Sequence, residues 1–238
     1  MKVAIISLSG SVGKTSLAAH MFYSRLGNPT VFAVETINET VSWYGLPCEE
    51  FSGDQFDELI TRILRTNNAL IDTGASNIES FVKHLVRHDG AHEEIDFFIV
   101  PVPVNAKEQS EAVKTIELLR GLGVPSDRVR VLFNSVKDNV EKEFKVFLSE
   151  IRKNGYLEPN LKAVVFYNRL FNWLHNKNMH IETILTDQTD YKALLASDSD
   201  DDQLNEWAEI LANQMAARSV KRNLDVAFGE LFNQQKGK

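Results

Sequence analysis

The sequence predicts an α/β protein with a mostly parallel central sheet, helices on both faces of that sheet, and a mostly helical C-terminal extension. Three observations support this prediction. Short apolar runs alternate with longer amphipathic stretches through residues 1–168. These runs are continuous, which is typical of parallel strands buried on both faces. After residue 168 the pattern becomes mostly helical, so we expect a core at 1–168 and an extension at 169–238.

The expected strands are short apolar runs that are bounded by turn residues or by helices. The run IDFFIVPVPV, for example, is nearly all apolar. The strands are expected at residues 2–8, 29–35, 68–74, 95–104, 128–134 and 161–168. Because parallel neighbours need crossover connections, we expect right-handed crossovers between them.

The expected helices fill the intervals between these strands, and each has one apolar face. In the first helix, Leu17, Ala18, Met21 and Phe22 share that face. The helix that follows the fourth strand ends at the glycines of GLG, which act as a stop signal. The helices are expected at residues 15–26, 53–66, 77–88, 107–123 and 140–155.

Residues 197–232 predict one long helix or two helices in sequence. The acidic run SDSDDD at 197–202 suits a helix N-terminus, where carboxylates cap the backbone and complement the helix dipole. Four apolar residues keep a 4-3-4 spacing, which suits a seam against another helix. The alternative is that this stripe packs on its own domain, as amphipathic helices ordinarily do. The stripe consists of Val220, Leu224, Ala227 and Leu231.

Composition excludes several classes of protein. The 238 residues carry a formal net charge of −7, which argues against nonspecific nucleic-acid binding by the whole surface and leaves a local basic patch open. Cys48 is the single cysteine, so there is no internal disulfide. No run approaches about 18 apolar residues, and the first apolar run is too short for a signal peptide. We therefore expect a cytoplasmic protein without a transmembrane segment.

The segment SLSGSVGKTS, residues 7–16, joins the first strand to the first helix. Gly10 and Gly13 supply a tight turn, and Lys14 and Thr15 open the helix. Backbone N–H groups in such a turn converge on phosphates, the lysine adds a cation, and the hydroxyl binds magnesium. The commonest phosphate loop has glycine where this chain has Leu8, so the motif is a variant form.

Three further polar residues end predicted strands and so lie at the same carboxyl edge of the sheet. Asp72 ends ALID, where its carboxylate can hold a magnesium-bound water opposite Thr15. Glu35 ends VFAVE. Asn134 ends VRVLFN, where its amide can pair with an adenine ring or simply form a turn.

These motifs resemble the ParA/MinD family of ATPases, whose deviant phosphate loop reads K-G-G-V-G-K-T/S. The matching segments are SGSVGKTS, VFAVE, ALIDTGAS and FFIVPV, and they cover roughly residues 1–136. The loop, the segment VFAVETINE and the tail DYKALLASDSDD are also similar to the StbB-type stability proteins of conjugative plasmids, which extends the likeness over most of the chain.

The resemblance implies a P-loop NTPase fold, ATP and Mg²⁺ as ligands, and a set of site residues. Lys14, Glu35 and Asp72 would be catalytic, and Thr15 and Asp72 would hold the metal. Glu35 would assist the attacking water, which Asn38 would orient. The nucleotide-binding set would be Ser9, Gly10, Ser11, Val12, Gly13, Lys14, Thr15, Ser16 and Asn134.

The chain departs from the family at two positions. Ser9 stands at the signature lysine, which reaches a partner's phosphates in a nucleotide-sandwich dimer, and Ile37 stands near the family's second acidic residue. A missing cation beside the leaving phosphate removes several kcal/mol of transition-state stabilisation. We therefore expect ATP binding with slow or partner-stimulated hydrolysis.

The expected function is an ATP-dependent switch in plasmid stability, partition or conjugation. The expected partners are a second copy of the chain, as a homodimer or in weak self-association, and a DNA-bound plasmid stability protein. Nonspecific DNA is an open alternative partner. A second hypothesis is a nucleotide-binding scaffold with little or no hydrolysis that recruits a DNA-bound partner. A small-molecule kinase would need an arginine-bearing lid, which the sequence does not show.

Two other constellations favour ordinary structural roles. His84, His88 and His92 are four residues apart, but no cysteine or carboxylate completes a tetrahedral metal set, so we expect a solvated helix face. The aromatic segment FYNRLFNWLHNKN at 166–178 is expected to be part core and part lid.

Overall fold

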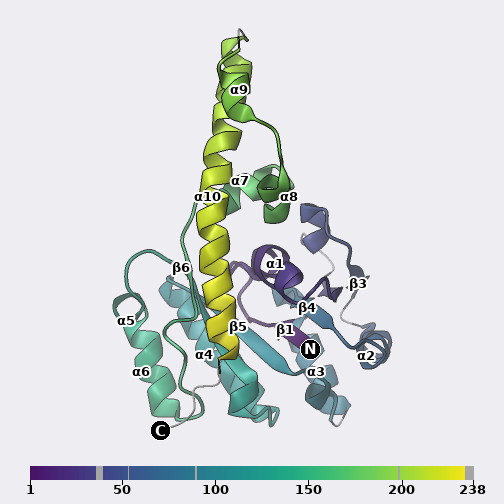
Figure 1. The fold of residues 1–238 in the computed structure, drawn as a ribbon. Helices are drawn as coiled ribbons and strands as arrows, with labels where there is room; N and C mark the ends of the chain where they lie inside the picture. The colour runs from purple at the N-terminus through teal and green to yellow at the C-terminus, as the bar shows by residue number, and fades with distance from the viewer. Residues whose placement is uncertain (36–39, 53, 89, 198, 234–238) are drawn as a thin grey trace.

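The computed structural model describes residues 1–35, 40–52, 54–88, 90–197 and 199–233. Seven strands form one sheet in the order β3-β2-β4-β1-β5-β6-β7 (Figure 1). Every neighbouring pair is parallel, which confirms the predicted fold class. The strands are β1 (Lys2–Ile5), β2 (Thr30–Val34), β3 (Glu49–Phe51), β4 (Ala69–Thr73), β5 (Phe97–Pro103), β6 (Val129–Val136) and β7 (Val164–Phe166).

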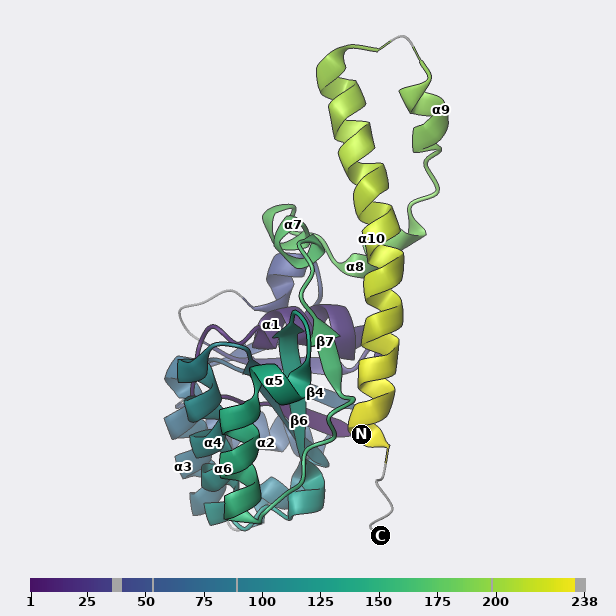
Figure 2. The same cartoon turned by 90° about the vertical axis from the view of Figure 1, so that its left-hand side faces the viewer.

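Both faces of the sheet are buried, because successive side chains of each strand point to opposite sides. In β1, Ala4 joins one apolar cluster, and Val3 and Ile5 join the other. The first cluster lies under α2 (Phe56–Leu64), α3 (Ile78–Arg87), α4 (Ala106–Gly121), α5 (Val140–Glu143) and α6 (Lys145–Asn154). The second lies under α1 (Lys14–Leu17), the π-helix η1 (Ala18–Tyr23), α7 (Leu170–Asn176), α8 (Ile181–Thr186) and α10 (Asp201–Phe232). Figure 2 shows the two helical layers edge-on.

Short elements complete the chain. The helix α9 (Tyr191–Leu195) precedes α10. The described parts of the connections contain the 3₁₀ turns η2 (Val41–Tyr44), η3 (Ala75–Asn77), η4 (Ala91–Glu94) and η5 (Ser126–Arg128). No helix among the residues that the structure describes is long and apolar enough to cross a membrane.

Three elements differ from the sequence prediction. The edge strand β3 is absent from the predicted set, because its three residues, EEF, offer a single apolar side chain. The helix expected at 140–155 is divided into α5 and α6 at Phe144, whose φ of −113° and ψ of 20° leave the helical region. The helix expected at 15–26 is a short α-helix followed by the π-helix η1.

The helix α10 is continuous over 32 residues, which corresponds to about 48 Å. The side chain of Asp200 accepts a hydrogen bond from the Gln203 N–H, which confirms the predicted cap. The predicted apolar stripe of α10 is buried in the cluster that includes β6, β7 and the π-helix η1, so it packs on the chain's own domain, as the alternative prediction had it. The N-terminal half of α10 extends beyond the body with α9 beside it (Figures 1 and 2).

Candidate functional site

The strand order places a crevice at the carboxyl edge of the sheet beside β1. The chain passes from β1 to β2 and leaves a gap that β4 later fills, and then β5 pairs with the other side of β1. In open parallel sheets, ligands bind outside the carboxyl ends of the strands where the order reverses in this way. The predicted phosphate loop follows β1 at this point.

The loop is folded around its own lysine. Lys14 is buried, and its Nζ donates a hydrogen bond of 2.7 Å to the carbonyl oxygen of Ser9. The Ser9 N–H donates to the Oγ of Ser7 at 3.1 Å. By contrast, no described residue accepts a hydrogen bond from the N–H groups of residues 10–12, which lie in the turn before α1. Unpaired N–H groups in a glycine turn before a helix are the donors from which anion-binding sites are built.

Gly13 is required by the shape of the loop. It has a φ of 82°, in the left-handed region, and it precedes the first residue of α1. A Cβ at this position would lie 2.9 Å from the Nδ2 of Asn134. That amide donates a hydrogen bond of 2.9 Å to the Val12 carbonyl oxygen, and its Oδ1 accepts one from the Ser135 N–H. Asn134 therefore braces the loop in this structure, and its contact with adenine stays a prediction.

Burial lowers the pKa of Lys14 to about 8, although the negative charges of Asp72 and Glu35 act in the opposite direction. Removing an ammonium group from water disfavours its charged form. An anionic ligand within reach would stabilise the charged form. The energetics of the lysine thus agree with a loop that is built to receive negative charge.

Asp72 lies in β4, opposite Ile5 of β1 and Ala33 of β2, so it reaches the loop from the neighbouring strand. Burial raises its pKa to about 6, while the Thr15 hydroxyl and the Lys14 charge lower it. Its Oδ1 is buried and has no hydrogen-bond partner among the described residues. A buried carboxylate oxygen without a partner, beside a threonine hydroxyl, fits the oxygen-rich surroundings that Mg²⁺ prefers.

Glu35 reaches the same group of residues from the end of β2. Its charge acts on both Lys14 and Asp72. The Ser76 hydroxyl donates to its Oε1 at 3.3 Å. Gly74 leaves room for this carboxylate, because a Cβ there would overlap the Glu35 Oε2. The predicted roles of Ile37 and Asn38 concern positions outside the described residues.

The structure therefore brings most of the predicted residues together. The loop residues 9–16 follow β1, Asp72 and Glu35 flank Lys14, and Asn134 braces the loop from β6. Ser11 and Ser16 line an adjacent cleft, together with Gly13 and Asn134.

This cleft has a volume of about 250 Å³ and continues from the loop toward α7. Its far wall is absent from the predicted site. Tyr44 comes from η2, Tyr167 and Asn168 follow β7, and Phe171, Asn172 and His175 come from α7. The aromatic run at 166–178 is the signal in the sequence that points to this wall. Buried Leu170 and Leu174 confirm that part of this run is core.

The predicted histidine face is half-buried rather than solvated. The ring of Phe56 stacks on His84 with 5.0 Å between centroids, and it also contacts His88. The Nε2 of His88 lies 3.0 Å from the Oδ1 of Asp57. Among the described residues, no group of three or more histidines, cysteines and carboxylates could hold a metal ion.

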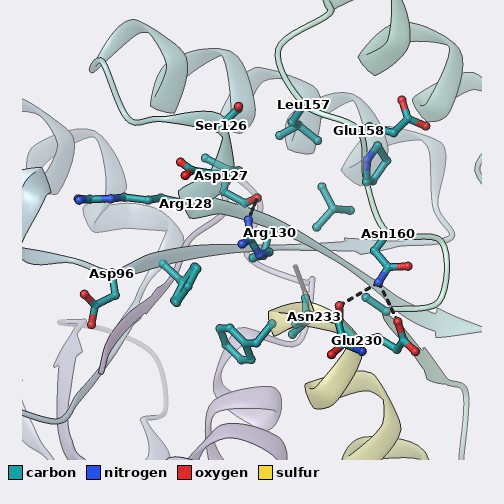
Figure 3. Close-up of a pocket in the computed structure, with 17 residues that line it drawn as sticks. Asp96, Ser126, Asp127, Arg128, Arg130, Leu157, Glu158, Asn160, Glu230 and Asn233 are labelled. Atoms are coloured by element: carbon teal, nitrogen blue, oxygen red, sulfur yellow. Dashed lines mark hydrogen bonds between the residues drawn. The ribbon is translucent and has the colours of Figure 1, made fainter. Parts of the chain in front are cut away.

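A larger cavity, of about 750 Å³, opens at the amino ends of β5 and β6, at the edge of the sheet opposite the loop (Figure 3). Its charged side chains have both signs, and the Arg130 guanidinium lies 4.9 Å above the Phe97 ring. Asn160 Nδ2 donates hydrogen bonds of 2.9 Å to the carbonyl and carboxylate oxygens of Glu230. None of the predicted site residues lies in this cavity.

No protein-family model matches the sequence, and no curated protein does. The fold, however, is similar to several solved structures. The MinC:MinD cell division complex of Aquifex aeolicus matches with a TM-score of 0.58 at 12% identity over all of both chains. MinD of the same organism matches with a TM-score of 0.55 at 14% identity, over 94% of this chain and 97% of that one. The ATP complex of a single-residue variant of Cyanothece McdA matches with a TM-score of 0.50 at 12% identity, over 100% of this chain and 99% of that one. The chain therefore has the fold of the MinD and McdA proteins, as the ParA/MinD resemblance implied.

Proposed function

We propose that the chain is an ATP-dependent switch of the ParA/MinD type, which binds Mg²⁺-ATP at residues 9–16. One observation carries the proposal: three N–H groups without an acceptor among the described residues precede a buried lysine at the reversal point of a parallel sheet. This arrangement suits a polyphosphate better than any neutral ligand. The similarity of the fold to McdA, which was solved with ATP, supports ATP as the ligand.

Each residue of the site has a separable role in this proposal. The N–H groups of residues 10–13 bind phosphate oxygens, and Lys14 exchanges the Ser9 carbonyl for the phosphates. Thr15 and Asp72 would hold Mg²⁺, directly or through water, and a bound Mg²⁺ neutralises phosphate charge. Glu35, whose charge acts on Lys14, would accept a proton from an attacking water.

The cleft beside the loop would receive the base and the ribose. Tyr167 and Phe171 offer aromatic faces on which a purine can stack. Asn134 and Asn168 line the same cleft and offer amide groups to the edge of the base. We propose adenine rather than guanine, because the guanine-reading string N/T-K-x-D does not follow the strand that is now identified as β6.

Nucleotide binding tests the proposal directly. Isothermal titration of the full chain with Mg²⁺-ATP should show binding that is weakened at least about a hundredfold in Lys14→Ala. Lys145→Ala is the matched control, because Lys145 is an exposed lysine at the first residue of α6. An unchanged affinity in Lys14→Ala would remove the site from this loop.

The rate of ATP hydrolysis depends on the residue at position 9. Ser9 contributes a carbonyl oxygen to Lys14 and brings no cation of its own. We therefore propose slow hydrolysis, or none, as in a nucleotide-dependent scaffold. The rate of phosphate release from the wild-type chain, measured with and without DNA, distinguishes a slow ATPase from a scaffold that does not hydrolyse ATP. A wild-type rate equal to the rate of the Lys14→Ala variant under both conditions would favour the scaffold.

We extend the proposal to plasmid stability, partition or conjugation on the StbB-type resemblance of the loop and of residues 190–202. The proposed partners are a second copy of the chain and a DNA-bound stability protein. Sedimentation with and without ATP tests self-association. A loss assay on a plasmid that carries this gene, wild type against Lys14→Ala, tests the role. Equal loss rates would remove the plasmid role and leave nucleotide binding intact.

A further inference from the structure

The net charge of the chain is concentrated in one projecting segment, residues 187–213, which we name the acidic hairpin. This segment contains eight of the 33 acidic residues of the chain and one of its 26 basic residues. The remaining chain therefore holds 25 of each, so the acidic hairpin accounts for the whole formal net charge of −7. Figures 1 and 2 show that it extends away from the sheet and its covering helices.

The acidic hairpin also exposes apolar side chains. The helix α9 has only five residues, so it covers little of the neighbouring turns of α10. As a result, six large apolar side chains in this region are only half-buried. They are Leu194, Leu195, Leu204, Trp207, Ile210 and Leu211. A projecting pair of helices with a half-exposed apolar face and an excess of negative charge is unfavourable when it faces solvent alone. Such a surface fits a partner of positive charge.

A notch of about 240 Å³ at the base of the acidic hairpin is the second observation. Its walls are largely apolar and come from α7, α8, α9 and α10. Trp173, Met179, Ile184 and Ile210 supply the apolar surface, and Asp187 and Glu206 supply carboxylates. Lys177 also lines the notch, with its ammonium 5.9 Å from the centre of the Trp173 ring.

The carboxylate of Asp187 is held in its ionised form. The Thr189 hydroxyl and the Tyr191 hydroxyl both donate hydrogen bonds to it, the latter at 2.6 Å. These donors lower the pKa of Asp187. The notch thus combines an apolar floor with two carboxylates and one lysine, and this net negative lining complements an apolar side chain beside a lysine or arginine.

We propose that the acidic hairpin is the docking surface for a basic amphipathic helix of a partner protein. One apolar side chain of that helix occupies the notch, and its lysines or arginines face Asp187 and Glu206. The apolar notch and the half-buried apolar side chains of α9 and α10 suit the apolar face of a helix. The charge of the surface repels nucleic acid and anionic lipid, so neither is the occupant.

A synthetic peptide tests this proposal on the full chain without nucleotide, so its failure is distinct from failure of the proposed ATP site. The probe is a labelled leucine/lysine amphipathic peptide of about 18 residues, or about five helical turns, followed by fluorescence anisotropy. We expect saturable binding, and no binding of the leucine/glutamate peptide of equal length. Absence of saturable binding up to about 100 µM would overturn the proposal.

Two matched variants locate the contact. Glu206→Lys changes the charge at the notch, and Glu209→Lys makes the same change at an exposed position of α10 outside it. We expect about tenfold weaker binding for the first and at most about threefold for the second. Equal weakening would show diffuse charge attraction and would overturn the proposal.

A third variant tests the notch without changing charge. Thr183→Trp places a large side chain at an exposed position in the wall of the notch. We expect at least about fivefold weaker peptide binding, with thermal unfolding unchanged. Unaltered peptide affinity, or saturable binding of random DNA or anionic vesicles at the acidic hairpin, would refute the assigned occupant.

Discussion

The buried ammonium of Lys14 leads to a quantitative prediction. Its pKa falls from 10.5 to about 8 on folding, and each pKa unit corresponds to about 1.4 kcal/mol. Burial of this charge therefore costs the free chain roughly 3 kcal/mol at pH 7. Because the folded pKa is the lower one, this cost is full below pH 8, shrinks as the pH rises, and vanishes above about pH 10.5.

Replacing the charge should therefore stabilise the free protein. Lys14→Met keeps much of the side-chain volume and removes the ammonium. It also loses the hydrogen bond to the Ser9 carbonyl, worth about 1 kcal/mol, and removes a positive charge near Asp72. Asp72 can respond by protonating at a higher pH. We expect a net gain of about 2 kcal/mol in unfolding free energy at pH 7.

Urea unfolding at several pH values checks this prediction. The difference between Lys14→Met and wild type should shrink between about pH 8 and pH 10.5, because the wild-type cost of the buried charge disappears over that range. The exposed Lys145→Met should change stability by less than about 0.5 kcal/mol at all pH values. Loss of stability in Lys14→Met at pH 7, or a difference that is constant with pH, would refute this account of the lysine.

Three further predictions concern the loop, the metal site and the long helix. Gly13→Ala should destabilise the fold by about 2 kcal/mol, and the control Gly27→Ala by about 1 kcal/mol, because Gly27 also has a positive φ but has open space where a Cβ would lie. Equal losses of stability in thermal unfolding would show that the close approach of Gly13 to the Asn134 amide does not matter. Asp72→Asn should stabilise the free chain at pH 7 by about 2 kcal/mol, because the raised pKa means that the wild type loses stability as the pH rises from about 4 to 6; a wild-type profile without that loss contradicts the burial argument. Leu224→Ala should lower the unfolding free energy, measured in urea, by about 2–5 kcal/mol, whereas Val226→Ala should hardly change it because Val226 is 60% exposed. Similar losses in the two variants would contradict the packing of α10 on the sheet.

Much of the fold could be predicted because most of its strands are continuous apolar runs, and such runs indicate buried strands without any knowledge of their tertiary neighbours. The strand β3 could not, since Glu49 and Glu50 pair with β2 through their backbones and leave no apolar pattern. The division between α5 and α6 could not be predicted either, because Phe144 is fully buried and would fit the apolar face of an unbroken helix. In both cases tertiary pairing or packing decides the local structure.

The candidate site divides in the same way. The loop and Asp72 could be predicted, because each lies within a few residues of a strand end that the pattern reveals. The aromatic run at 166–178 predicts part of a lid, but the position of the cleft wall beside the loop could not be predicted. The Trp43 Nε1 donates to the His175 carbonyl oxygen at 3.0 Å, and these residues are 132 positions apart in the chain. The role of Asn134 as a brace was likewise invisible, because it depends on the 2.9 Å contact with the Val12 carbonyl oxygen.

The helix α7 is a common wall of the two proposed sites. Phe171 and His175 line the cleft beside the loop, while Trp173 lines the notch below the acidic hairpin. The adjoining helix α8 is tied to the π-helix that follows α1, since the His180 Nε2 contacts the Ala19 carbonyl oxygen at 2.8 Å. A ligand that shifts α7 from one side therefore changes the surface on the other. Thermodynamic linkage then requires that ATP alters peptide affinity by the same factor as the peptide alters ATP affinity, so two independent titrations must agree if both proposals hold.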